Sequence, residues 1–147
     1  MENEEVEISK NLILKYFSFL KDQGYGVEVE GNDSKLFLES LNVVFTNEIK
    51  KREITVSFTK SRIDEEIRFT FSASVVRIPY NDPYEDFFSL YAYGEATGNE
   101  FNTTIVNRFD EREAESIVKK ISEFLQKNAS VFVDGTAWEK GYYPKWN

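Results

Sequence analysis

The sequence predicts an α+β fold, an antiparallel β-meander of about four strands packed against an N-terminal and a long C-terminal α-helix. Two observations predict this class. Consecutive segments in the first half of the chain alternate apolar and polar side chains, the pattern of strands that bury one face. A stretch near each end of the chain repeats apolar residues at the spacing of an amphipathic helix. Because a sheet with one apolar face must bury it, we expect both helices to lie on that face.

The first predicted element is a helix from about Glu4 to Gln23. Its apolar side consists of Ile13, Tyr16, Phe17 and Leu20. Gly24 follows, and glycine adopts the left-handed conformation that ends many helices without a Cβ clash. We therefore expect the helix to end there.

Four strands are expected after this helix. They cover residues 27–30, the run from Leu36 to Phe45, and the alternating segments 53–59 and 67–75. Polar, turn-like segments separate them at Gly31–Ser34, Asn47–Lys50 and Ser61–Glu65. Connections this short join antiparallel neighbours. The exposed face of the last two strands should then carry Glu53, Thr55, Ser57, Thr59, Arg68, Thr70, Ser72 and Ser74.

Pro79 and Pro83 are expected to end the sheet, because proline has no backbone N–H to donate to a neighbouring strand. Asp82 followed by proline has the pattern of a helix start. This pattern predicts a short helix from Pro83 to about Tyr93. Apolar residues at alternate positions over 88–92 suit a strand equally well, so both interpretations stay open.

A long helix is predicted from Asp110 onward, because Asp110 and Glu113 have the spacing of a capping box. Its apolar stripe comprises Ala114, Ile117, Val118, Ile121, Phe124 and Leu125. Before this helix, Thr103–Val106 is expected to add an edge strand. After it, Val131–Val133 forms either a brief strand or a continuation of the helix.

Length and composition limit the possible functions. At 147 residues, the chain is expected to form a single α+β domain over 1–147, with an aromatic-rich tail at 136–147. A formal net charge of −8 repels DNA and anionic lipid surfaces, so neither nucleic acid nor a membrane is an expected partner. The chain has no cysteine and no histidine, which excludes disulfides, thiol nucleophiles, imidazole catalysis and thiolate or imidazole metal sites. No catalytic residue, metal or cofactor is expected.

The sharpest carboxylate cluster comprises Asp82, Glu85 and Asp86, interleaved with Tyr80 and Tyr84. Such a group of oxygen ligands is typical of a Mg²⁺ or Ca²⁺ site or of a carboxylate-dependent hydrolase. A plainer interpretation makes Asp82 a helix cap and the other acids a solvated first turn, which the helix dipole favours. We favour the plainer interpretation of the chemistry and keep Asp82, Tyr84, Glu85 and Asp86 as candidate partner-binding residues.

The C-terminal tail is a second candidate surface. Trp138, Tyr142, Tyr143 and Trp146 combine ring area with polar tips, a composition typical of protein interfaces. An equally good interpretation is that the tail closes one end of the core. The basic triplet Lys50–Arg52 is expected to flank a hairpin turn and discourage edge pairing rather than contact a phosphate.

The chain resembles, over most of its length, small acidic bacterial proteins of unassigned function, some of them suspected immunity proteins of toxin systems. The resemblance lies in the helix that closes on Gly24–Gly26, the meander, the segment Asn81–Leu90 and the long helix that runs into Val133–Gly135. It implies a bacterial cytoplasmic binding protein without catalysis. An acidic domain would associate rapidly with a basic partner such as a nuclease-type toxin.

These observations favour a noncatalytic protein-binding module, in its most specific form an immunity-type inhibitor of a basic toxin. The alternative is a carboxylate-dependent hydrolase or divalent-metal-binding domain centred on Asp82, Glu85 and Asp86. A third possibility is a small-molecule cup lined by Phe69 and Phe71. The first seven residues carry four glutamates and no basic residue, unlike a secretory signal, so a cytoplasmic location is expected.

Overall fold

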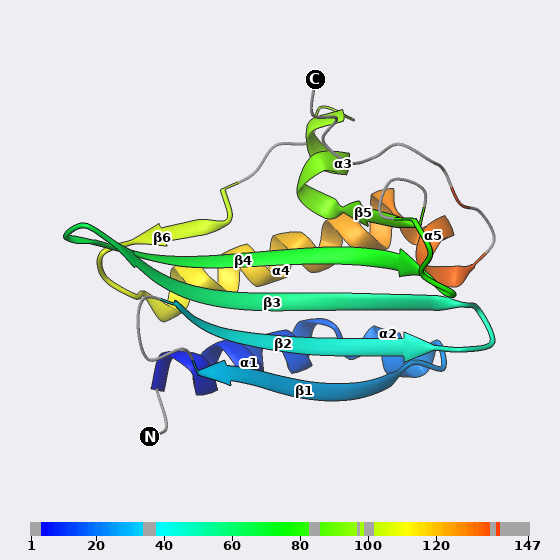
Figure 1. Ribbon diagram of the computed structural model, residues 1–147, viewed down its shortest axis with the longest axis horizontal. Coiled ribbons are helices and arrows are strands. Elements are labelled where there is room, and N and C mark those ends of the chain that lie inside the picture. Colours follow the sequence, from blue (N-terminus) through cyan, green and yellow to red (C-terminus); the bar gives the residue numbers. More distant parts are fainter. Residues whose placement is uncertain are drawn as a thin grey trace.

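An antiparallel sheet of six strands forms one layer of the structure, a computed structural model that describes residues 4–33, 38–82, 86–96, 98, 102–135 and 138. The strands are β1 (Gly26–Asp33), β2 (Leu38–Asn47), β3 (Arg52–Ile63), β4 (Glu66–Arg77), β5 (Phe87–Ser89) and β6 (Thr104–Val106). Their order is β1-β2-β3-β4-β5, and β6 also pairs with β4, near its other end (Figure 1). The predicted class and the antiparallel meander are confirmed.

β1, β3 and β4 are longer than the alternation of apolar and polar residues predicts. β3 and β4 continue until only Asp64 and Glu65 remain between them, and Asp64 takes the left-handed φ of 58° that so tight a turn requires. The turn predicted from Gly31 is wrong at its start, because Gly31 pairs with Leu41 and Asp33 with Glu39. Pairing with β2 overrides the weak strand propensity of these residues.

Two helices, α1 (Glu4–Tyr16) and α4 (Glu111–Asn128), lie on one face of the sheet (Figure 1). The predicted continuous helix to Gln23 is wrong, because the chain turns after Tyr16 and resumes as the short α2 (Phe19–Asp22). At the break, Ser18 Oγ donates to the Lys15 carbonyl at 2.9 Å. The turn directs the fully buried ring of Phe17 towards Phe45, with ring centroids 6.2 Å apart.

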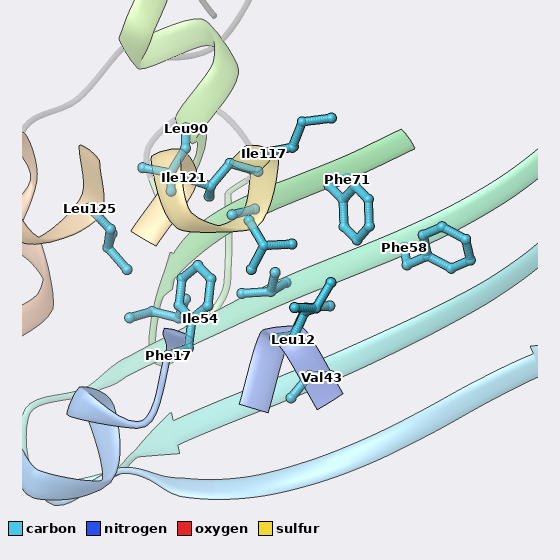
Figure 2. Close-up of a cluster of buried hydrophobic side chains, with 14 of the residues drawn as sticks. Leu12, Phe17, Val43, Ile54, Phe58, Phe71, Leu90, Ile117, Ile121 and Leu125 are labelled. Carbon is cyan, nitrogen blue, oxygen red and sulfur yellow. The ribbon is translucent and has the colours of Figure 1, made fainter. Parts of the chain in front are cut away.

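The core lies between the helices and the sheet. Figure 2 shows side chains of α1, the sheet and α4 meeting there, among them Leu12, Ile54 and Ile121. The ring of Phe58 packs on those of Phe71 and Phe69 at centroid distances of 5.1 and 6.3 Å. These rings occupy the space that a ligand cup would need. The pocket that borders Phe71 has a volume of about 160 Å³, below the usual range of ligand sites.

The segment after the sheet combines both interpretations that the sequence left open. Phe87–Ser89 forms β5 on the edge of β4, and α3 (Leu90–Ala96) follows directly. The predicted helix from Pro83 to Tyr93 is therefore wrong over 86–89, and residues 83–85 lie outside the described chain. Unpaired backbone groups on the edge of β4 explain this outcome, because a strand there satisfies them.

The C-terminal helices follow the sequence closely. Asp110 caps α4, and its Oδ1 accepts hydrogen bonds from the backbone N–H groups of Arg112 and Glu113 at 2.9 and 3.3 Å. The predicted start of the long helix is confirmed. The chain then continues as the helix α5 (Ser130–Asp134) rather than as a strand. None of the helices in the described residues combines the length and apolar character needed to cross a bilayer.

Candidate functional site

Asp86 is a predicted site residue whose carboxylate accepts four hydrogen bonds. Its Oδ1 accepts hydrogen bonds from Nε and Nη2 of Arg77 at 3.0 and 2.7 Å. Its Oδ2 accepts from the backbone N–H groups of Asn81 and Asp82, both at 3.0 Å. The main chains also bond, because Arg77 N–H donates to the Asp86 carbonyl at 2.7 Å. The carboxylate thus joins the end of β4 to the segment that leads into β5.

These bonds decide what Asp86 can do. The Arg77 side chain first, and then the backbone N–H of Asn81, hold the pKa of the Asp86 carboxyl below its usual range. Both carboxylate oxygens are engaged within the protein, so Asp86 serves as an anchor and is a poor metal ligand or general acid. Asp82 contributes its backbone, since its carbonyl accepts the N–H of Asp86 at 2.8 Å.

Glu85, the third acid of the cluster, and Tyr84, the remaining candidate beside it, lie outside the described residues. Within the part of the chain that the structure describes, no group of three or more Asp or Glu residues is placed to hold a metal ion. The carboxylate alternative therefore gains no support from Asp82 and Asp86. What the cluster provides is a fixed position for Arg77.

Arg52 lies beside this anchor. It is the first residue of β3 and pairs with Arg77, the last residue of β4. Although charged, Arg52 is only 5% exposed, and its Nη1 donates to the carbonyls of Lys51 and Lys50 at 3.0 and 3.3 Å. Burial lowers the pKa of Arg52 and the positive charge of Arg77 lowers it further, whereas Tyr25 and Asp134 act in the opposite direction.

Trp138 covers both arginines. Its ring lies 4.9 Å from the guanidinium carbon of Arg52 and 5.4 Å from that of Arg77. Cation–π attraction and packing stabilise such an arrangement, with Trp the strongest of the aromatic partners. Trp138 is half-buried against the core. The other candidate aromatics of the tail, Tyr142, Tyr143 and Trp146, lie outside the described residues.

Tyr25 and Gly135 position the end of α5, which lies opposite these arginines. The hydroxyl of Tyr25 donates to the carbonyl of Val133 in α5, and burial raises the pKa of Tyr25 to about 12. Gly135 has a φ of +81°, and a Cβ at this position would lie 3.1 Å from the Cβ of Lys50. The end of α5 therefore approaches the β2–β3 turn more closely than a larger residue permits.

Between the two arginines and the end of α5 lies an open cleft of about 630 Å³. It lies at the end of the sheet where β3 begins and β4 ends, and Figure 1 shows these two strand ends beside each other. We call it the arginine cleft. Its lining comprises Ile49, Lys50, Lys51, Arg52, Arg77, Ile78, Pro79, Asn81, Asp86, Asp134 and Gly135. Four of these side chains are basic and two are acidic, the reverse of the balance over the whole chain.

Sequence reasoning found part of the arginine cleft and missed the rest. Lys50 and Lys51 flank a hairpin turn as expected, but Arg52 is buried rather than exposed at a sheet margin. Arg77 gave no signal, because nothing in its local pattern distinguishes it from other strand-end residues. A prediction that the two strands pair over 52–77 would have brought the two arginines together.

A second surface lies on the face of the sheet away from the helices. The alternation in β3 and β4 puts the predicted set of hydroxyl and charged side chains there, and Ser57 Oγ donates to Asn42 Oδ1 of β2 at 2.6 Å. Glu53 of β3 lies on this face, and Glu28 and Glu30 of β1 project from it at the margin. Among the residues that the structure describes, Arg68 is the basic side chain on this face. Its Nε forms an ion pair with Glu66 at 2.7 Å.

β1 forms the margin of this surface. It pairs with β2 over all eight of its residues, and no strand in the described chain pairs with its other edge. Val27 and Val29 project to the helix side and remain 37% and 43% exposed. The edge therefore presents apolar side chains on one face and acidic side chains on the other. We call it the β1 edge.

Comparison of the chain with known protein families, with curated proteins and with solved structures finds no match.

Proposed function

We propose that the chain is a noncatalytic protein-binding module that takes up an extended basic segment of a partner protein along the β1 edge. The observation that carries the proposal is the combination of an unpaired, eight-residue strand edge with Glu28 and Glu30 on its exposed face. Strand addition is a common mode of peptide recognition, because the free N–H and C=O groups of an edge accept another strand.

The composition of β1 supports this use. Sheet edges are usually protected from pairing by lysine, proline or bulges. β1 contains no lysine and no proline, and its register with β2 is continuous from Gly26 to Asp33. An added strand would extend the apolar row of Val27 and Val29 on one face and meet the glutamates on the other. The segment that fits best alternates apolar and basic residues.

The charges of β1 favour a segment of another protein over a second copy of this chain as the added strand. If two copies of β1 paired antiparallel with their sheets continuous, Glu28 and Glu30 of one copy would face those of the other. Like charges directly opposite each other destabilise a strand pair. A basic segment instead gains attraction from the same glutamates, and the net charge of −8 would speed its approach at low salt.

The most specific form of the proposal is that of an immunity-type inhibitor of a basic toxin in the bacterial cytoplasm. It rests on the resemblance of the sequence and on the acidic charge. It requires that the association rate with such a toxin fall as salt is raised, because steering between exposed charges is screened. A rate that does not depend on salt would remove the electrostatic basis of this form.

The test uses a synthetic eight-residue peptide that alternates valine and lysine, and a matched peptide that alternates valine and glutamate. We expect the lysine peptide alone to slow amide hydrogen exchange in residues 26–31, because new backbone hydrogen bonds protect the edge. Glu28→Lys combined with Glu30→Lys should abolish this protection. The control, Glu48→Lys with Glu65→Lys, makes the same change in charge at exposed turns and should leave the protection intact.

Three outcomes would contradict the proposal. One is protection by both peptides alike, since charge would then play no role. Another is protection located outside β1. The last is concentration-dependent protection of residues 26–31 without any peptide, which would make a second copy of the chain the occupant.

A further inference from the structure

The backbone groups that point outward along the β1 edge follow from the pairing of the whole sheet. Along an antiparallel strand, successive residues direct their N–H and C=O groups alternately to one neighbour and to the other. In β4, Phe71 N–H donates to the Thr103 carbonyl, just before β6. Arg77 N–H likewise donates to the Asp86 carbonyl, just before β5. Odd-numbered residues of β4 therefore face β5 and β6, and even-numbered residues bond to β3.

The registers continue this alternation across the sheet. Even-numbered residues of β4 lie opposite odd-numbered residues of β3, and even-numbered residues of β3 lie opposite odd-numbered residues of β2. Even-numbered residues of β2 lie opposite even-numbered residues of β1, so Glu28 and Glu30 bond through their backbones to β2. The N–H and C=O groups of Val27, Val29 and Gly31 therefore point to the open margin of the sheet, where no strand of the described chain meets them (Figure 1).

The glutamates of β1 occupy the positions where an added strand would come closest. Glu28 and Glu30 form no ion pair with any side chain that the structure describes. In an antiparallel pair at this edge, the residues opposite them would be the pairs without mutual hydrogen bonds, whose side chains are closer than those of the bonded pairs. A lysine or arginine at each of these two positions would therefore be attracted at short range.

Gly31 leaves a gap in the apolar row on the helix side of β1. Val27 and Val29 precede it in that row, and Leu41 of β2 is its cross-strand partner. Gly31 is exposed, and a Cβ at this position would have no atom of the described residues within 4 Å. An aromatic side chain on a neighbouring strand fills such a gap, because its ring packs over the glycine and covers the main chain.

We propose that the segment taken up at the β1 edge runs antiparallel to β1 and has the residue order aromatic, basic, aliphatic, basic, aliphatic. The aromatic residue lies opposite Gly31, the aliphatic residues opposite Val29 and Val27, and the basic residues opposite the two glutamates. The direction is that of the strand pairs of the described sheet, which are antiparallel, the slightly more stable arrangement per residue. Selection of this order rests on the proposed function, because it presupposes that a strand is added at the β1 edge.

The test compares three capped peptides that bind to the full chain. They are Lys-Phe-Lys-Val-Lys-Val-Lys, its reversal Lys-Val-Lys-Val-Lys-Phe-Lys, and Lys-Val-Lys-Val-Lys-Val-Lys. Amide hydrogen exchange of Val27, Val29 and Gly31, followed as each peptide is titrated, gives the affinity. We expect the first peptide to bind about two- to fivefold more tightly than either of the others, the effect of one favourable aromatic cross-strand pair.

Gly31→Val should remove this preference, because the valine side chain occupies the gap, and should leave binding of the peptide without phenylalanine intact. Gly26→Val is the matched control, because it adds the same side chain to β1 on the opposite face. A Cβ at Gly26 would lie 3.9 Å from the Thr46 carbonyl oxygen, an ordinary contact, so this variant should fold and keep the preference.

The outcomes separate this selectivity from strand addition itself. Equal affinities of the three peptides, with the three amides protected, would overturn the selectivity and leave the proposed function standing. Tighter binding of the reversed peptide would overturn it too, because the added strand would then be parallel. Loss of the preference in Gly26→Val would remove Gly31 as its cause. Protection of β1 by none of the peptides would contradict the proposed function as well.

Discussion

Arg52 and Arg77 occupy directly opposite positions on β3 and β4, and the ring of Trp138 lies over both guanidinium groups. Two like charges in this relation destabilise the sheet unless other groups offset them. Asp86 does so for Arg77 through two hydrogen bonds to one carboxylate oxygen. The carbonyls of Lys50 and Lys51 accept hydrogen bonds from Nη1 of Arg52. One end of the sheet is therefore held by a charge arrangement rather than by apolar packing alone.

Asp86 should make the stability of the protein depend on pH in the acid range. Because its pKa is lowered in the folded state, the unfolded chain binds the proton more tightly. The stabilisation is present above the ordinary aspartate pKa of about 4 and is lost as the pH falls towards the lower folded value. Urea unfolding over a series of pH values measures it.

Asp86→Asn should lower the free energy of unfolding at neutral pH and flatten its decline in acid, because the amide cannot offset the charge of Arg77. Asp64→Asn, at an exposed turn whose φ of 58° asparagine tolerates, is the matched control and should leave the profile near that of the unchanged chain. Parallel pH profiles for Asp86→Asn and the unchanged chain would show that the carboxylate does not stabilise this end of the sheet.

Tyr25→Phe should cost about 1–2 kcal/mol of stability, because it leaves the Val133 carbonyl without its donor in a buried setting. Tyr16→Phe is the comparison, since its hydroxyl bonds to Glu115 at 3.0 Å in a partly exposed site and should cost less. Denaturant unfolding at neutral pH measures both variants. Equal losses would mean that burial adds nothing to the Tyr25 bond.

The same tyrosine should be visible in alkaline titration. Its pKa of about 12 in the folded state exceeds the ordinary tyrosine value of 10.0, so the unfolded chain releases the proton first. Stability from this group is complete below about pH 10 and is lost as the pH rises towards about 12. Absorbance of the phenolate should show a late component that Tyr25→Phe removes.

Gly135→Ala should destabilise the protein by more than Gly98→Ala. Both glycines have positive φ, +81° and +76°, so alanine pays a similar conformational penalty of about 1–2 kcal/mol at each. At Gly135 the added Cβ would also lie 3.1 Å from Lys50 Cβ and 3.3 Å from its carbonyl oxygen, whereas no atom of the described residues lies within 4 Å of a Cβ at Gly98. Equal losses of unfolding free energy would refute the close approach of α5 to the β2–β3 turn.

Alternating and helical patterns were enough to predict the α+β class, the meander and the long helix capped by Asp110. These patterns involve only residues that are close along the chain. Burying one apolar face stabilises such a segment wherever it lies in the fold. The break at Phe17 was not predicted, and the strand at Phe87–Ser89 was one of two interpretations that the sequence left open. Both depend on distant groups, the core around Phe45 and the free edge of β4.

The sequence by itself determined the charge, the absence of cysteine and histidine, and the segments that must bury an apolar face. Tertiary structure decided which charges meet. Asp86 looked like one of several acids in a cluster, and became the partner of Arg77 because two strand ends converge on it. Charges pair through space over a few ångströms, whereas the sequence gives only the order of residues along the chain. Charge pairs nine or more residues apart are therefore determined only when the strands pair in their register.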